Sequence, residues 1–170
     1  MTDKPKPTSV NAEGIFEPFS VENVPWENWS ENTRYGSRSR YLSGFGGASH
    51  VGVAMEELAP GMESTLNHYH MLEEEQALIL AGEMTLKLGE KTYLVKTGDY
   101  VCFPAGQKAG HSFYNHSDAL CRFLIIGEKN PHDVIVYPET GRVSVRLTGE
   151  GYDKSATMDY WQGADTNKKK

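Results

Sequence analysis

Three residues whose types and spacing suit metal chemistry lie in the stretch from Gly61 to Gly82, GMESTLNHYHMLEEEQALILAG. His68 and His70 are separated by one residue, so on an extended chain their side chains project from the same face. Glu75 follows His70 by five positions. Imidazole and carboxylate together suit Fe, Mn, Ni, Cu or Zn. The histidine pair alone fits a metal site and a strand end with two solvated histidines equally well.

Two neighbouring carboxylates, Glu73 and Glu74, compete with Glu75 for the role of acidic ligand. Strand alternation places Glu75 on one face with Ala77 and Ile79, which we expect to point inward. Glu74 then faces the other way. We therefore predict that Glu75 is the acidic member of the site.

From Tyr41 onward the chain consists of short extended runs separated by glycine, proline or Asn/Asp turns. In residues 84–88, apolar side chains alternate with polar ones, which is typical of a half-buried strand. The turn at 89–91 then leads into a second alternating run, and the two predict a hairpin. Many short strands without a helical period indicate an all-β barrel or sandwich.

The predicted organisation is an N-terminal arm at 1–40, partly disordered, a β-barrel at 41–147, and a C-terminal tail at 148–170 whose aromatics pack on the barrel. The arm contains Ile15, Phe16, Phe19, Trp26 and Trp29, which are costly to leave exposed. We expect it to lie across its own barrel or across a second subunit. Together with the need to cover edge strands, this predicts a homodimer.

A second segment, Gly98 to Asn115, reads GDYVCFPAGQKAGHSFYN. Turns at Gly98 and at Pro104 to Gly106 flank a short strand, and His111 opens the next one. By itself His111 fits a core or surface histidine better than a ligand. Its place after a His-x-His and Glu stretch favours the ligand.

These two segments resemble the two sequence motifs of the cupin superfamily. His68, His70, Glu75 and Gly82 match the first motif, and Gly98, Pro104, Gly106, His111 and Asn115 match the second. The spacing departs at two places, since six residues separate Gly61 from His68 and four separate Gly106 from His111. Both insertions fall in loops, where extra residues are tolerated. The segments GHSFYN, FLIIGEKNPHDVIVYP and DYW also resemble small bacterial single-domain cupins.

The resemblance implies an all-β double-stranded β-helix, or jelly-roll barrel, with one divalent transition metal, Fe, Mn, Ni or Zn, inside it. It implies the metal ligands His68, His70, Glu75 and His111. The residues expected to have structural roles are Gly82, Gly98, Pro104, Gly106 and Asn115. Candidates for lining a small-molecule pocket are Gln76, Tyr100, Phe103, Phe113 and Arg122.

Three functions follow from such a site. Three imidazoles and one carboxylate leave open positions for water, substrate or O₂, so a non-haem iron dioxygenase acting on a small organic molecule is expected first. A metal-dependent sugar isomerase, epimerase or lyase is the second expectation, and a non-catalytic sugar-binding or regulatory protein is the third. No catalytic residue beyond the metal ligands can be assigned from the sequence.

The composition limits the partners. A net charge of −6 over 170 residues argues against nucleic acid or an anionic membrane surface. No apolar run approaches the roughly 20 residues of a membrane span. The N-terminus, MTDKPKPTSV, lacks the apolar segment of a signal peptide, so we expect a cytoplasmic protein.

Overall fold

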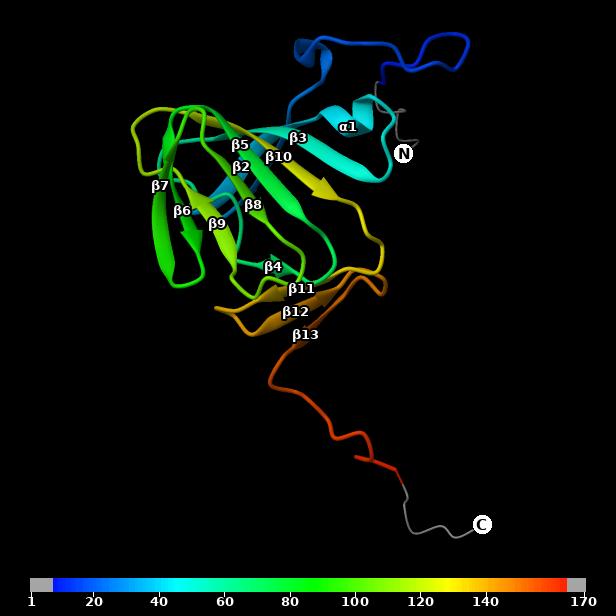
Figure 1. Cartoon of the computed structure of the whole chain (residues 1–170), viewed down its shortest axis with the longest axis vertical. Helices are drawn as coiled ribbons and strands as arrows, with labels where there is room; N and C mark the ends of the chain where they lie inside the picture. The colour runs from blue at the N-terminus through cyan, green and yellow to red at the C-terminus, as the bar shows by residue number, and fades with distance from the viewer. Residues whose placement is uncertain (1–7, 165–170) are drawn as a thin grey trace.

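The computed structural model describes residues 8–164 and builds them mainly from β-strands (Figure 1). The first elements along the chain are a 3-10 turn, η1 (Val21–Asn23), and the strands β1 (Glu27–Glu31) and β2 (Tyr35–Tyr41). A one-turn helix, α1 (Leu42–Phe45), follows. The remaining strands are β3 (Val51–Leu58), β4 (Tyr69–His70), β5 (Glu75–Ala81), β6 (Glu83–Leu88), β7 (Lys91–Lys96), β8 (Tyr100–Phe103), β9 (His111–Tyr114), β10 (Cys121–Glu128), β11 (Val134–Tyr137), β12 (Arg142–Val145) and β13 (Glu150–Asp153). The all-β, double-stranded β-helix prediction is confirmed.

Two sheets face each other across the main core. The larger has the strand order β1-β2-β3-β10-β5-β8, and the smaller has the order β7-β6-β9. Side chains from both sheets meet in one apolar cluster, whose members are Leu58, Ala77, Ile79, Met84, Leu86, Val95, Phe103, Phe113, Cys121 and Phe123. Burying one large aliphatic or aromatic side chain of this kind stabilises the fold by roughly 1.5–3 kcal/mol.

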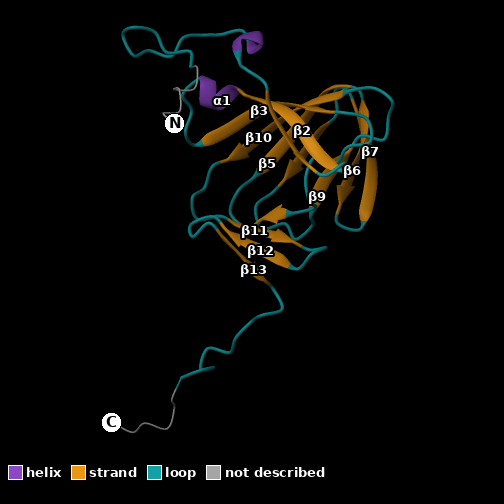
Figure 2. Ribbon diagram, turned by 180° about the vertical axis from the view of Figure 1, so that it is seen from behind, coloured by secondary structure: helices purple, strands orange, loops and turns teal. Residues whose placement is uncertain are grey.

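A third sheet, of order β13-β12-β11-β4, lies across one end of the barrel in both views (Figures 1 and 2). Its innermost strand, β4, carries His70, which pairs with Ile135 of β11. The residues that enter β11 therefore lie beside the first histidines of the predicted metal site.

The predicted hairpin at 84–95 is present as β6 and β7, paired from Glu83 opposite Lys96 to Leu88 opposite Lys91. The turn into it requires glycine at Gly82, where φ is +87° and a Cβ atom would lie 2.8 Å from Cys121 Sγ. Any other residue there meets both a strained backbone and a steric clash.

The fold differs from the sequence expectation at its two ends. Strands β1 and β2 pair with each other and with β3, so the barrel sheet begins at Glu27 and not at Tyr41. After β13 the tail extends away from the barrel, and Tyr160 and Trp161 are exposed and contact each other instead of packing on it (Figure 1). The disorder expected at the N-terminus falls partly on residues 1–7, which lie outside the described residues.

Candidate metal centre

Four side chains from three segments of the chain converge inside the barrel. The Oε2 atom of Glu75, at the start of β5, lies 3.0 Å from His111 Nε2, 3.3 Å from His70 Nε2 and 3.8 Å from His68 Nε2. The potential ligand atoms of His68, His70 and Glu75 all lie within 4.8 Å of one another. The structure thus brings together the four residues that the sequence singled out.

The outer nitrogen atoms of two histidines are fixed by acceptors. His68 Nδ1 donates to the Leu66 carbonyl oxygen at 2.8 Å, and His70 Nδ1 donates to Asp133 Oδ2 at 2.6 Å. A neutral imidazole with its proton on Nδ1 presents a lone pair at Nε2. In their neutral forms both histidines therefore direct an Nε2 lone pair at the Glu75 carboxylate, so a positive charge, either a proton or a metal ion, is needed between these groups. The residues present fit a bound cation.

The pKa values point the same way. Burial, with His111 as a second cause, lowers the pKa of His68 to about 4, so this imidazole is neutral. Burial also disfavours a charged His70, but Glu75 and Asp133 outweigh it and raise its pKa to about 8. Burial would raise the pKa of Glu75, yet the hydrogen bond from His111 and the nearby His70 hold it well below its ordinary value. In the absence of a metal ion, the cluster therefore holds a proton on His70, beside the Glu75 carboxylate, where the metal ion would lie.

His111 reaches the cluster despite the longer loop before it. Its backbone N–H donates to the His68 carbonyl at 2.8 Å, and the His68 N–H donates back to the His111 carbonyl at 3.2 Å. The Phe103 ring stacks on the imidazole, with centroids 3.7 Å apart and an interplanar angle of 5°. At Gly110 a Cβ atom would lie only 2.0 Å from Asn67 Oδ1. The extra loop residues are therefore accommodated by a glycine packed against Asn67.

Acidic and basic groups lie on the outer side of His70. Of these, Asp133 and Arg146 were not among the sequence candidates. Asp133 is fully buried and also accepts a hydrogen bond from the Leu72 N–H at 2.9 Å. Glu73 is buried and bonds to Arg146 at 2.6 Å, with its Oε2 3.4 Å from His70 Nδ1. Glu73, a rival ligand in the sequence, thus faces the outer nitrogen of His70. Asp133 carried no spacing signal, since it is 63 positions from His70.

A cavity of about 260 Å³ adjoins the cluster and is lined by His68, Glu75 and His111 together with Trp29, Phe113 and Glu56 among others. A further cavity of about 420 Å³ touches Glu75 and Glu56 from the side of Gly52 and Gly127. Glu56, on β3, was not among the sequence candidates. The only sequence signal for Glu56 is its position on the face that alternation gives to Ala54 and Leu58, in a strand that contains one other charged residue, Glu57.

The predicted pocket residues fall into two groups. Phe113 lines the cavity, and Phe103 lies against His111. In contrast, Gln76 and Tyr100 bond to each other on the opposite face of β5 and β8, and Arg122 pairs with Glu57. We therefore no longer assign these three residues to the pocket. Strand alternation explains this, because Gln76 neighbours the inward-facing Glu75.

The residues expected to be structural lie in turns and buried contacts. Gly98 and Gly106 adopt φ values of +94° and +73°, and Pro104 precedes the turn at Gly106. Asn115 is fully buried, and its amide group donates to the carbonyl oxygens of Leu58 and Ala119, each at 2.8 Å. Asn115 thereby ties β9 to the ends of β3 and of the loop before β10.

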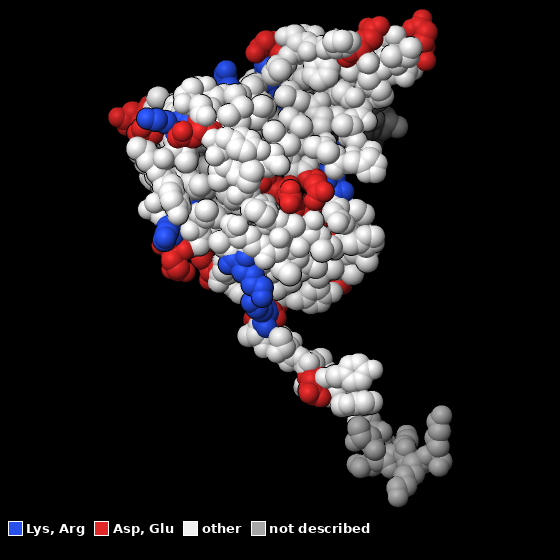
Figure 3. Space-filling view, in the orientation of Figure 1, with Lys and Arg blue, Asp and Glu red and all other residues white. Residues whose placement is uncertain are grey.

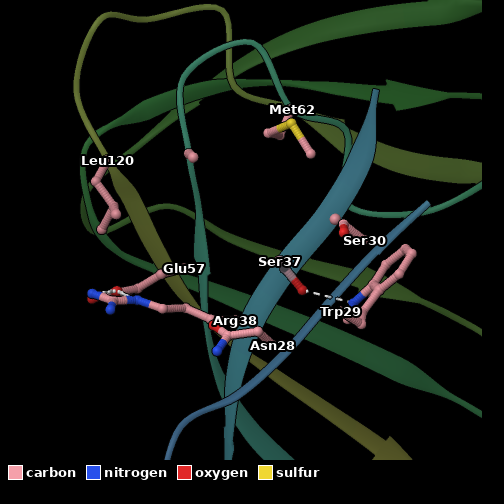
Figure 4. Close-up of a pocket in the computed structure, with 10 residues that line it drawn as sticks. Asn28, Trp29, Ser30, Ser37, Arg38, Glu57, Met62 and Leu120 are labelled. Atoms are coloured by element: carbon pink, nitrogen blue, oxygen red, sulfur yellow. Dashed lines mark hydrogen bonds and ion pairs between the residues drawn. The ribbon is translucent and has the colours of Figure 1, made fainter. Parts of the chain in front are cut away.

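Another cavity, of about 470 Å³, lies on the outer side of β2 and β3 near Trp29, Met62 and Leu120 (Figure 4). Its one carboxylate, Glu57, is fully buried and already pairs with Arg38 and Arg122. Its lining contains no histidine or cysteine. This cavity therefore offers less chemistry than the one beside the histidines.

Acidic side chains gather beside the end of β10 on the face drawn in Figure 3, with basic atoms next to them. The cavity lining in this region includes Glu73, Glu128, Lys129 and Arg146. The lining of this cavity is thus mixed in charge. Among residues 8–164, no helix has the length and apolar character to cross a membrane.

Comparison with known proteins places this geometry in a family. The model of the cupin domain matches residues 54–127. A structure described as a putative sugar phosphate isomerase from Acidithiobacillus ferrooxidans is 26% identical, with a TM-score of 0.75, covering 88% of this chain and 94% of that protein. A sugar phosphate isomerase from Silicibacter pomeroyi is 27% identical, with a TM-score of 0.74 and coverages of 83% and 95%.

The polyketide cyclase RemF from Streptomyces resistomycificus shares the fold at 24% identity, with a TM-score of 0.55 over 67% of this chain and 80% of its own. No curated protein matches the sequence. The family match covers β3 to β10 and all four converging residues. Residues 54–127 of the chain therefore form a cupin domain.

Proposed function

We propose that His68, His70, Glu75 and His111 bind one divalent transition metal ion and that the protein is a metal-dependent isomerase of small hydroxy-carbonyl compounds of the sugar phosphate type. The observation that carries the metal site is the convergence of three imidazole nitrogens on one carboxylate oxygen at 3.0–3.8 Å. When bound, such a metal polarises a carbonyl or hydroxyl group of a substrate.

The protein's own groups supply the rest of the site. Asp133 and the Leu66 carbonyl keep the protons of His70 and His68 on their outer nitrogens. The cavity of about 260 Å³ combines aromatic walls with a few polar groups, which suits a small organic molecule. The second cavity, of about 420 Å³, also touches Glu75, and Lys129 and Arg146 in its lining are compatible with an anionic substrate group.

Similarity over nearly the whole chain favours the isomerase over the dioxygenase that the ligand set predicted first. The two full-length similar structures are both described as sugar phosphate isomerases. The dioxygenase stays a prediction, because the same four residues leave positions open for O₂. A non-catalytic sugar-binding role is the third candidate, and the complete ligand set counts against it.

Metal content tests the site. We expect about one metal ion per chain in the purified protein by mass spectrometry, and strong losses in His70→Ala and His111→Ala with circular dichroism unchanged. His50→Ala is the matched control, since His50 is exposed and lies outside the cluster. Wild-type metal content in both site variants would refute the assignment.

The reaction class is tested by two assays on the metal-loaded protein. Interconversion of aldose and ketose phosphates, followed by NMR, supports the isomerase. O₂ uptake with bound iron supports the dioxygenase and contradicts the isomerase. Binding of a sugar phosphate with neither turnover nor O₂ uptake supports the non-catalytic role.

We also propose a homodimer. Strand β1 forms one edge of the larger sheet, all five of its residues are exposed, and Ile15 and Phe16 in the preceding arm are exposed as well. Unpaired edges and exposed aromatics of this kind favour association. Light scattering at micromolar concentration is expected to give twice the mass of the chain, and a monomer would contradict the proposal.

A further inference from the structure

Glu56 occupies an inward position on β3. It lies opposite Phe123 of β10 and opposite Ser39 of β2 in the register of the larger sheet. Its neighbours on the same face are Ala54 and Leu58, both buried. Glu56 is thus a carboxyl group on the barrel's inner face, where an apolar side chain is expected.

The inner face between Glu56 and the metal centre combines small residues with Ile125, which lines both cavities there. Gly127 pairs with both Glu75 and Gly52, so Glu75 has glycines beside it across two strands. Ala54 follows Gly52 on the inward face of β3, before Glu56. Both cavities at the centre include Glu56 and Glu75 in their linings. These cavities give a substrate room to contact both carboxyl groups, with Ile125 as an apolar wall.

The Glu56 carboxyl group does not take part in an ion pair that would stabilise the fold, in contrast to its neighbour Glu57. The adjacent Glu57, on the other face of β3, is fully buried and pairs with Arg38 and Arg122. For Glu56, no lysine or arginine among residues 8–164 forms an ion pair with it. The nearby Ser37 and Ser39 favour the charged form of Glu56 and lower its pKa, but neither carries a charge. A buried carboxyl without a cationic partner is costly, and such groups gather at functional sites.

The protonation behaviour of Glu56 agrees with this geometry. Burial raises its pKa to about 7, although the Ser37 and Ser39 hydroxyls act in the opposite direction. A carboxyl that is neither fully charged nor fully neutral near pH 7 is suited to both accept and return a proton.

We propose that Glu56 is the catalytic carboxyl group that moves a proton between two carbon atoms of the substrate, a role that rests on the isomerase function proposed above. Glu56 takes the proton from the hydroxyl-bearing carbon, and the C–H electron pair becomes the double bond of an enediolate while the hydroxyl proton passes to the carbonyl oxygen. Glu56 then returns its proton to the neighbouring carbon, and the second oxygen becomes the new carbonyl. No oxidant or reductant is consumed.

The experiment uses metal-loaded full-length protein in D₂O with aldose phosphates of three to six carbons as probes, followed by proton NMR. The wild type is expected to exchange the hydrogen next to the carbonyl for deuterium. Glu56→Gln is expected to lower that exchange by at least about 100-fold while its metal content stays that of the wild type. Glu56→Asp, which keeps the carboxyl group, should recover part of the rate. Glu90→Gln, in the exposed turn between β6 and β7, is the control and should exchange normally.

The outcomes separate the two proposals. Exchange by Glu56→Gln within threefold of the wild type overturns the role of Glu56 and leaves the isomerase standing. Loss of metal from Glu56→Gln also overturns it, because Glu56 would then belong to the ligand set. A metal-loaded wild type that exchanges no probe overturns the isomerase and the role of Glu56 together.

Discussion

His70 Nδ1 and Asp133 Oδ2 lie 2.6 Å apart, and both side chains are buried. The aspartate comes from the segment that enters β11, and β11 pairs with the strand that carries His70. Because the aspartate accepts the Nδ1 proton, the Nε2 atom that faces Glu75 is left with its lone pair. The third sheet therefore orients a residue of the proposed metal centre and does more than close the barrel.

Asp133→Asn is expected to lower metal affinity by about 10- to 100-fold, as is usual when the partner of a metal-binding histidine is removed. The amide keeps an oxygen that can accept from the Leu72 N–H, but it no longer provides a charge beside His70. Competition with a metal-sensitive dye measures the affinity. Asp118→Asn, at an exposed position, is the control. Unchanged affinity in Asp133→Asn would show that His70 needs no such partner.

Gly110→Ala is expected to disturb His111. The added methyl group would lie 2.0 Å from Asn67 Oδ1 and 3.0 Å from Pro138 Cγ, so the loop or Asn67 must move. Overpacking of this kind costs about 1–3 kcal/mol, and the displaced loop leads directly into His111. We predict a lower melting temperature and weaker metal binding. Gly44→Ala is the control, because its methyl group would meet only Tyr41 Cβ at 4.0 Å; equal effects of the two variants would contradict the prediction.

Removing the two arginines that pair with Glu57 is expected to cost more stability than removing the charge of Glu57 itself. The Glu57 side chain has no exposed surface, whereas Arg38 and Arg122 are 45% and 42% exposed. Replacing both arginines by alanine leaves a buried carboxylate without a partner and is expected to cost about 3–5 kcal/mol. Glu57→Gln leaves arginines that can turn to water, so about 1–2 kcal/mol is expected. Urea unfolding measures both, and a larger cost for Glu57→Gln would reverse the interpretation.

The sequence predicted the converging residues because motif spacing and strand alternation both act over short distances. Motif spacing to Gly82 and strand alternation both favour Glu75 over Glu74, and in β5 Ala77 and Ile79 are buried on the same side as Glu75. Asp133 and Glu56 escaped because their relation to the site depends on which strands become neighbours. The pairing of β11 with β4 and of β3 with β10 joins residues more than 60 positions apart. Such long-range pairing leaves no periodic pattern in the sequence.

The same limit applies to the ends of the chain. Residues 27–41 lack a sustained apolar period, because one face of β2 carries serines and the other carries arginines that stack on Trp26. Their assignment to an arm was therefore reasonable from composition, although β2 is a full member of the larger sheet. The tail, in contrast, contains several aromatic residues, which predicted that it packs on the barrel. In the structure Tyr160 is 87% exposed.

The last prediction concerns Glu56 and stability in the metal-free protein. The carboxyl pKa is raised from 4.5 to about 7 in the folded state, with burial as the main cause and the nearby charge of Glu75 adding to it. Between these two pH values the folded chain binds more protons at this site than the unfolded chain. The contribution of Glu56 to stability is thus most favourable below pH 4.5 and is lost as the pH rises to about 7.

Glu56→Gln does not ionise, so its stability relative to the wild type should increase as the pH rises. The gain is expected to be near zero below pH 4.5 and to reach about 3 kcal/mol above pH 7. Urea unfolding of both proteins in EDTA, from pH 4 to pH 8, measures the difference, and Glu90→Gln should show none. Parallel pH profiles for Glu56→Gln and the wild type would mean that water or a cation solvates Glu56 in the cavity. If Glu56→Gln is more stable than the wild type and also loses proton transfer, Glu56 lowers the stability of the fold and is needed for the reaction.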